Sequence, residues 1–313
     1  MAEVIEACPD VYDVDQQMCT TGQAARRQVV SQQDCTYVLH GTWATEAQWW
    51  RRAGGFSRAL DAVHPGVWRC QNVQVAEQPW SGDNTHTARD EGGRQLARHI
   101  QRLEQRRHNG ELAYRNINLV AHSHGGNVVL SALKRLAQTD VRVHHVVLIA
   151  TPQVRIQYGD WGGPSAGVPS SQDAALDAGT AFSGRQNYRE EWFYFVPDVF
   201  QAVTGTFYNI YSPEDGVQTD GATLLDGINA EQVPDSEHFA GARSGRTYFG
   251  PDSHRVTNIQ QNTRVGSTDA HSVLHSNRMG QAVGHLLAGR SWSAARRRAG
   301  VPSTITNDDD MGE

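Results

Sequence analysis

Short apolar runs alternate along this chain with longer stretches in which apolar residues recur every three or four positions. The runs have the length and the flanking turn residues of buried strands. They cover residues 37–40, 72–76, 117–121, 145–150, 207–211 and 255–260. The amphipathic stretches predict helices over residues 44–63, 85–108 and 126–138. Strands that alternate with helices predict an α/β fold with a mostly parallel sheet, right-handed crossovers and helices on both faces.

Two segments, residues 155–206 and 221–253, are long for connections within a compact domain and predict functional insertions. The first is rich in glycine and serine and then aromatic at residues 192–195, which fits a lid with an apolar underside. A helix that buries those aromatic residues fits equally. No linker divides the 313 residues, so we expect one domain over residues 1–313, with a polar, solvated C-terminal tail at 291–313.

Ser123 lies in the run Ala121-His122-Ser123-His124-Gly125, directly after an apolar run and before an amphipathic stretch. This order predicts a serine on a sharp strand-to-helix turn with a strained backbone. The residues two places before and after the serine must be small, because larger side chains would collide there. Ala121 replaces the first glycine of the G-x-S-x-G pattern, which keeps the position small. The motif predicts Ser123 as a nucleophile. The alternative is a serine that only caps the following helix.

A serine nucleophile needs a base to accept its proton and an acid to orient that base. We expect Asp215 as the acid, because it lies beside Gly216 in the turn after the apolar run 207–211. Glu214 and Asp160 are the alternative carboxylates.

His271 is the predicted base, since it lies in the loop between the last predicted strand and a terminal helix over residues 277–287. The alternative bases are His275, His254 and His238. His271 and His275 have the spacing of a zinc-binding helix but lack the glutamate of H-E-x-x-H, so we expect no metal.

The chain order serine, aspartate, histidine resembles that of the α/β-hydrolases and differs from the orders of the chymotrypsin and subtilisin folds. The resemblance covers about residues 28–289, the expected core. Residues 78–84, which lead into a predicted helix carrying Arg89, and residues 149–152 resemble the lipase-like branch, that is bacterial lipases and PGAP1-like serine esterases. Residues 121–127 and 270–277 are similar to antibacterial phospholipase effectors of type VI secretion systems.

The resemblance implies an oxyanion hole, a substrate class and partners. The oxyanion would be held by the backbone N–H groups of His124 and of Thr42, which follows His40-Gly41. The histidine side chains around the turn would be structural, and Trp43 would line an acyl pocket or pack in the core. A lipid or other acyl ester is the implied substrate, without a cofactor. An effector would also imply an immunity protein as a partner.

Charge and composition exclude other classes. The net charge of −6 argues against nucleic-acid binding, and no run approaches the roughly 20 apolar residues that a membrane span needs. Residues 1–10 lack the pattern of a secretory signal, so we expect a cytoplasmic protein or one exported by a non-Sec route. The four cysteines, Cys8, Cys19, Cys35 and Cys70, are then expected as reduced thiols, whereas delivery to the periplasm would favour two bridges.

Two functions fit these residues. The first is a serine ester hydrolase, a lipase or phospholipase, that forms an acyl-enzyme on Ser123 with Asp215 and His271. The second is a non-catalytic protein of hydrolase fold that binds a partner through its insertions. The presence of the nucleophile, acid, base and oxyanion residues together favours the hydrolase.

Overall fold

The computed structural model of the chain describes residues 33–68, 80–158, 189–192, 197–220, 239–245 and 253–312. Its centre is a five-stranded sheet with the order β1-β2-β3-β6-β8, in which every neighbouring pair is parallel. The strands are β1 (Cys35–Leu39), β2 (Ile117–His122), β3 (Val146–Ile149), β6 (Phe207–Tyr211) and β8 (Val256–Gln260). The predicted α/β class and parallel sheet are therefore confirmed.

The strands are apolar because helices cover the sheet. All residues of β1, β2 and β3 are buried, which is why these strands read as mostly apolar runs and not as alternating ones. The five strands coincide with five of the six predicted runs to within two residues. The sixth run, residues 72–76, lies outside the described residues.

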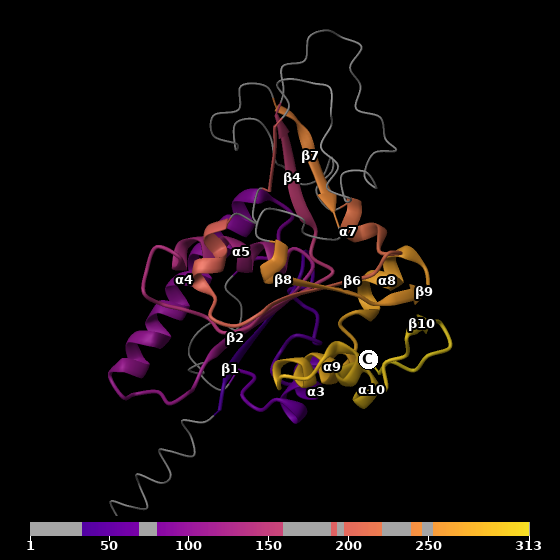
Figure 1. Cartoon of the computed structure of the whole chain (residues 1–313), viewed down its shortest axis with the longest axis horizontal. Helices are drawn as coiled ribbons and strands as arrows, with labels where there is room; N and C mark the ends of the chain where they lie inside the picture. The colour runs from indigo at the N-terminus through magenta and orange to yellow at the C-terminus, as the bar shows by residue number, and fades with distance from the viewer. Residues whose placement is uncertain are drawn as a thin grey trace, which may run out of the picture.

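Helices flank the sheet in two pairs. They are α3 (Gly55–Val63), α4 (His86–His108), α5 (Gly125–Leu136) and α9 (Asn277–Leu287). α4 packs against α5 and α3 against α9, and Figure 1 shows the two pairs on opposite sides of the sheet. The predictions for α4, α5 and α9 are confirmed to within two residues. Thr85 caps α4, because its hydroxyl accepts the N–H of Ala88 at 3.1 Å.

The helix predicted over residues 44–63 is wrong in its first half, where the chain forms turns until α3 begins at Gly55. Two side chains hold these turns: Trp50 Nε1 donates to the carbonyl of Ala44, and Ser57 Oγ donates to the carbonyl of Trp50. A side chain at Gly54 would collide with the backbone, since a Cβ there would lie 1.8 Å from the carbonyl oxygen of Gln48. The close backbone approach, and not helix periodicity, decides this segment.

Parts of both long insertions form a second sheet. β4 (Gln153–Tyr158) pairs antiparallel with β5 (Arg189–Trp192) and with β7 (Phe239–Gly245). Figure 1 shows β4 and β7 projecting away from the central sheet. Trp192 thus lies in a strand, so the helix alternative is wrong there, while residues 193–196 lie outside the described residues.

The C-terminal segment is not the solvated tail that its polarity predicts. Residues 292–298 form α10 (Trp292–Arg298), and β10 (Thr304–Thr306) pairs parallel with β9 (Asn262–Arg264). Ile305 and Met311 are buried, and the carbonyls of Met311 and Gly312 accept the first N–H groups of α9. A few separated apolar anchors order a segment that has no hydrophobic periodicity.

Cys35 forms a disulfide, so the expectation of reduced thiols is wrong for this residue. Its partner lies outside the described residues. Cys35 is buried at the start of a central strand.

None of the helices in the described part of the chain is long and apolar enough to cross a membrane. Within the same ranges, no group of three or more His, Cys, Asp or Glu side chains could hold a metal ion.

Candidate active site

Ser123 occupies a strained turn between β2 and α5. Its φ is 55°, a left-handed conformation that is rare for a residue with a side chain and costs about 1–3 kcal/mol. The turn is fixed by its own backbone, since the N–H of Ser123 donates to the carbonyl of Ile149 at 2.8 Å and its carbonyl accepts the N–H of Gly126 at 2.9 Å. The alternative of a plain cap is disfavoured, because a helix-capping residue ordinarily has negative φ.

Close contacts explain the small residues around Ser123. A Cβ on Gly41 would lie 2.5 Å from Ser123 Cβ, and one on Gly125 would lie 2.3 Å from the carbonyl oxygen of His40. Ala121, which replaces a glycine of the motif, lies in β2 opposite Leu39 and Leu148 and needs no positive φ. Gly41 and Gly125 are therefore the glycines that the turn requires, because they let the chain after β1 and the start of α5 approach closely.

Asp215 and His271 are joined by a hydrogen bond of 2.8 Å from Nδ1 of the ring to Oδ2 of the carboxylate. Asp215 lies between β6 and the short helix α7 (Gly216–Asp220) and is fully buried. Its second oxygen, Oδ1, accepts the N–H of Gln218 at 2.9 Å. Because the carboxylate can only accept from His271, the ring proton is held at Nδ1 and the lone pair of the neutral ring is at Nε2.

The structure distinguishes Asp215 from the other candidate carboxylates. Glu214, its immediate neighbour, is exposed to solvent. Asp160 lies outside the described residues. Of the described candidates, only Asp215 contacts the predicted base.

His271 lies in a short helix, α8 (Ser267–Val273), and not in the predicted loop. Gly266 precedes this helix, and the carbonyl of Gly266 accepts the N–H of Ala270 at 2.7 Å. Among its rivals, His275 stacks on Trp49 with ring centroids 4.4 Å apart, and His254 is exposed. His238 lies outside the described residues.

His271 lies against the serine turn. The residue just before Ser123, His122, donates from Nε2 to the carbonyl of His271 at 3.0 Å, and the two rings lie 4.5 Å apart. Asp215 follows β6 and Ser123 follows β2, so both lie at the carboxyl edge of the parallel sheet, the usual position of ligand sites in open α/β sheets.

The two predicted oxyanion donors lie on either side of the serine turn. His124 is the N-cap of α5, so its backbone is at the positive end of a helix dipole. Thr42 follows Gly41, the residue that packs on Ser123, and its Oγ1 is a buried atom with no hydrogen-bond partner among the described residues. The next N–H, that of Trp43, donates to the carbonyl of Gly82 at 2.9 Å and ties this turn to a neighbouring loop.

Aromatic side chains pack beside the turn that carries Thr42. His40 donates from Nδ1 to the carbonyl of Gly41 at 2.6 Å, and its ring lies 5.0 Å from that of Trp50 and 5.4 Å from that of Trp80. Burial lowers the pKa of His40, so its ring is neutral at pH 7. Trp43 itself is 77% exposed with a φ of 56°, so the expectation of a core residue is wrong.

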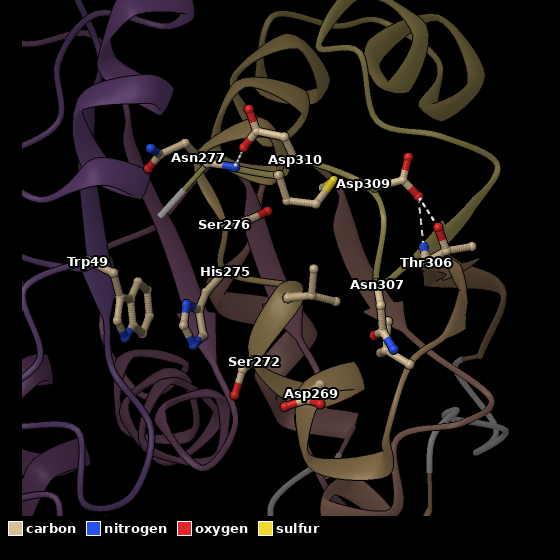
Figure 2. Close-up of a pocket in the computed structure, with 14 residues that line it drawn as sticks. Trp49, Asp269, Ser272, His275, Ser276, Asn277, Thr306, Asn307, Asp309 and Asp310 are labelled. Carbon is tan, nitrogen blue, oxygen red and sulfur yellow. Dashed lines mark hydrogen bonds between the residues drawn. The ribbon is translucent and has the colours of Figure 1, made fainter.

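A pocket of about 640 Å³ lies beside α8. Asp269 and Ser272 of α8 line it, together with Trp49, His275 and the C-terminal segment that carries Asp309 (Figure 2). Ser123, Asp215 and His271 are not among its lining residues. This pocket is thus a neighbour of the candidate active site and not the site itself.

Sequence reasoning missed the contacts that assemble the site. Nothing in the local sequence indicates that His122 bonds to His271 or that Gln218 bonds to Asp215. A scan against models of known protein families finds no match to this chain, and a search of curated proteins finds none either.

Proposed function

We propose that this chain is a serine ester hydrolase of the α/β-hydrolase type that acts on lipid or other acyl esters through an acyl-enzyme on Ser123. The observation that carries the proposal is the 2.8 Å bond from His271 to the buried Asp215, beside a serine whose φ is 55°. Strain of this kind persists where the surrounding structure demands it, and it is concentrated at reactive sites. A binding protein would need neither the strained serine nor the buried acid.

The chemistry follows from the roles of the three side chains. His271 Nε2 would take the proton of Ser123 Oγ as the oxygen attacks the ester carbonyl carbon, and the carbonyl oxygen would become an oxyanion between the N–H groups of Thr42 and His124. The C–O bond to the alcohol would then break, with the proton passing from His271 to the leaving alcohol. Water would attack the acyl-serine by the same route, which gives the free acid and regenerates Ser123.

Asp215 would hold the imidazole with Nε2 toward the serine and would stabilise the imidazolium that forms. No cofactor enters this sequence of steps.

The lipid class of the substrate rests on the resemblance of residues 78–84 and 149–152 to lipases. The delivery of the protein as an antibacterial effector rests on the narrower similarity at residues 121–127 and 270–277. The disulfide at Cys35 supports an oxidising destination such as a periplasm, because disulfides persist in such compartments. An effector of this kind would be held inactive in its producer by an immunity protein.

The test compares the wild-type protein with Ser123→Ala and with Ser272→Ala, an exposed serine of α8 next to His271. Two readouts are covalent labelling by a fluorophosphonate probe and release of fatty acid from mixed phospholipid and triglyceride vesicles. We expect labelling and release by the wild type and by Ser272→Ala, and neither by Ser123→Ala. Labelling that persists in Ser123→Ala would refute the assignment, and no labelling of the wild type would favour the binding protein.

A further inference from the structure

Four aromatic rings form a cluster that joins the serine turn to the helix of the candidate base. His122 lies 4.5 Å from His271 and 4.7 Å from His275 between ring centroids. Trp49 stacks on His275 at 4.4 Å with the planes 10° apart and meets His122 edge-on at 5.5 Å. The cluster therefore links three separate parts of the chain: the end of β2, the α8 region and the turns before α3.

The hydrogen bond from His122 satisfies a carbonyl that α8 leaves without a helical partner. A helix cannot bond its last four carbonyls internally, and His271 lies within the last four residues of α8. The N–H of His275, the helical donor for that carbonyl, goes to Ser272 instead at 3.1 Å. The ring N–H of His122 takes its place at 3.0 Å. The backbone of the candidate base is thus bonded to the side chain of the residue that precedes the candidate nucleophile.

This bond is stable at neutral pH because the rings of His122 and His275 carry no charge there. Burial, and then repulsion from His271 and His275, keeps the pKa of His122 well below its ordinary value. Burial also lowers the pKa of His275 to about 4. A neutral ring has a single N–H, and the carbonyl of His271 fixes it at Nε2 of His122.

The stack of Trp49 and His275 backs this bond. Figure 2 shows the two rings side by side at the wall of the pocket behind α8. His275 lies two residues after the end of α8, so a shift of that ring toward the pocket would pull on the C-terminal end of α8. The stack resists such a shift through ring-to-ring contact.

We propose that His122 is a positioning residue for His271: its Nε2–H, backed by the stack of Trp49 and His275, fixes α8 relative to the serine turn and so sets the approach of His271 Nε2 to Ser123 Oγ. This inference rests on the proposed function and goes beyond it, because it assigns a role to a side chain that takes no part in proton transfer.

The kinetic test uses three substitutions of His122. Glutamine can place an N–H about where Nε2 stands, asparagine has a donor that is too short, and leucine has none. We expect His122→Leu and His122→Asn to lower kcat on a soluble ester by about tenfold or more, with KM unchanged. A tenfold change in rate corresponds to the free energy of one hydrogen bond, here the bond that positions His271. His122→Gln should recover most of the rate. His254→Leu, at an exposed histidine, is the matched control.

A second measurement does not depend on catalysis. Hydrogen exchange of the peptide over residues 267–276 is followed in Ser123→Ala and in Ser123→Ala combined with each His122 variant. We expect faster exchange with leucine and asparagine and near-normal exchange with glutamine. Exchange that is unchanged by His122→Leu, or a glutamine variant as slow in turnover as the leucine variant, would overturn the inference. A wild type that never labels would refute the proposed function alone.

Discussion

Asp215→Asn would test the orientation of His271 with the least change in shape. Asp215 is fully buried, and its two oxygens accept from different donors, Oδ2 from His271 Nδ1 at 2.8 Å and Oδ1 from the N–H of Gln218 at 2.9 Å. The backbone N–H of Gln218 can only donate, so the oxygen of an asparagine must remain there. The amide NH₂ must then face His271.

The predicted size of the effect follows from this geometry. Two donors cannot face each other at 2.8 Å, so the ring would move its proton to Nε2 and accept at Nδ1. An imidazole protonated at Nε2 cannot take the proton of Ser123, and the imidazolium would also lose its carboxylate. We expect kcat to fall by about 10⁴-fold, equivalent to about 5 kcal/mol, as for the same change in other serine triads. The volume and the bond to Gln218 are kept, so the fold should survive.

The assay measures kcat and KM on a soluble p-nitrophenyl ester together with the rate of fluorophosphonate labelling. Glu214→Gln is the matched control, because Glu214 is the exposed neighbour of Asp215 and loses the same charge. We expect this control to stay within about twofold of wild type, as is usual for surface positions. Thermal unfolding of each variant shows whether the fold is intact.

Two outcomes would refute the reasoning. If Asp215→Asn kept a tenth or more of the wild-type kcat, the carboxylate would not set the tautomer of His271. If Glu214→Gln were the inactive variant, the acid would be the exposed neighbour, and the buried bond would be structural.

Three further predictions follow from the structure. Gly41→Ala should destabilise the protein by about 1–3 kcal/mol and slow labelling of Ser123, because the new Cβ would lie 2.5 Å from Ser123 Cβ; an unchanged unfolding midpoint and labelling rate would contradict this. Acidification from pH 6.5 to pH 4 should destabilise the fold, because burial lowers the pKa of His99 and of His275 from 6.5 to about 4, so the unfolded chain binds more protons than the folded one in this range. Urea unfolding should show that the free energy of unfolding falls by roughly 1.4 kcal/mol per pH unit for each extra proton. A free energy of unfolding that does not change with pH would argue against neutral buried rings. Expression directed to the periplasm should reduce bacterial colony counts, with relief by Ser123→Ala; equal harm from this variant would remove the effector proposal.

The central elements could be predicted because the local sequence pattern reflects their burial. Strands that are covered on both faces carry mostly apolar residues, and β2 and β3 show such runs. α4 carries its cap at Thr85 and an apolar stripe through Leu96, Ile100 and Leu103. In the strands the length of the apolar run, and in α4 the spacing of the apolar residues, matches the element that forms.

The errors occurred where particular side-chain contacts outweigh the hydrophobic pattern. Residues 44–54 form turns because Trp50 and Ser57 bond back to the backbone there. Residues 291–312 are ordered by Ile305 and Met311, which are isolated apolar residues in a polar segment. The disulfide of Cys35 likewise depends on which cysteine comes near it, and sequence spacing does not state that.

The sequence by itself determined which residues are candidates for the proposed chemistry, since a serine between small residues, followed in order by carboxylates and histidines, is what acyl transfer requires. Only the tertiary structure decided which of these side chains meet. Glu214 and Asp215 are adjacent in the chain, but the turn after β6 exposes one and buries the other against a histidine 56 positions away. The bond from His122 to His271 spans 149 positions. The direction of a side chain at the end of a strand depends on the packing around it, and residue order does not encode that packing locally.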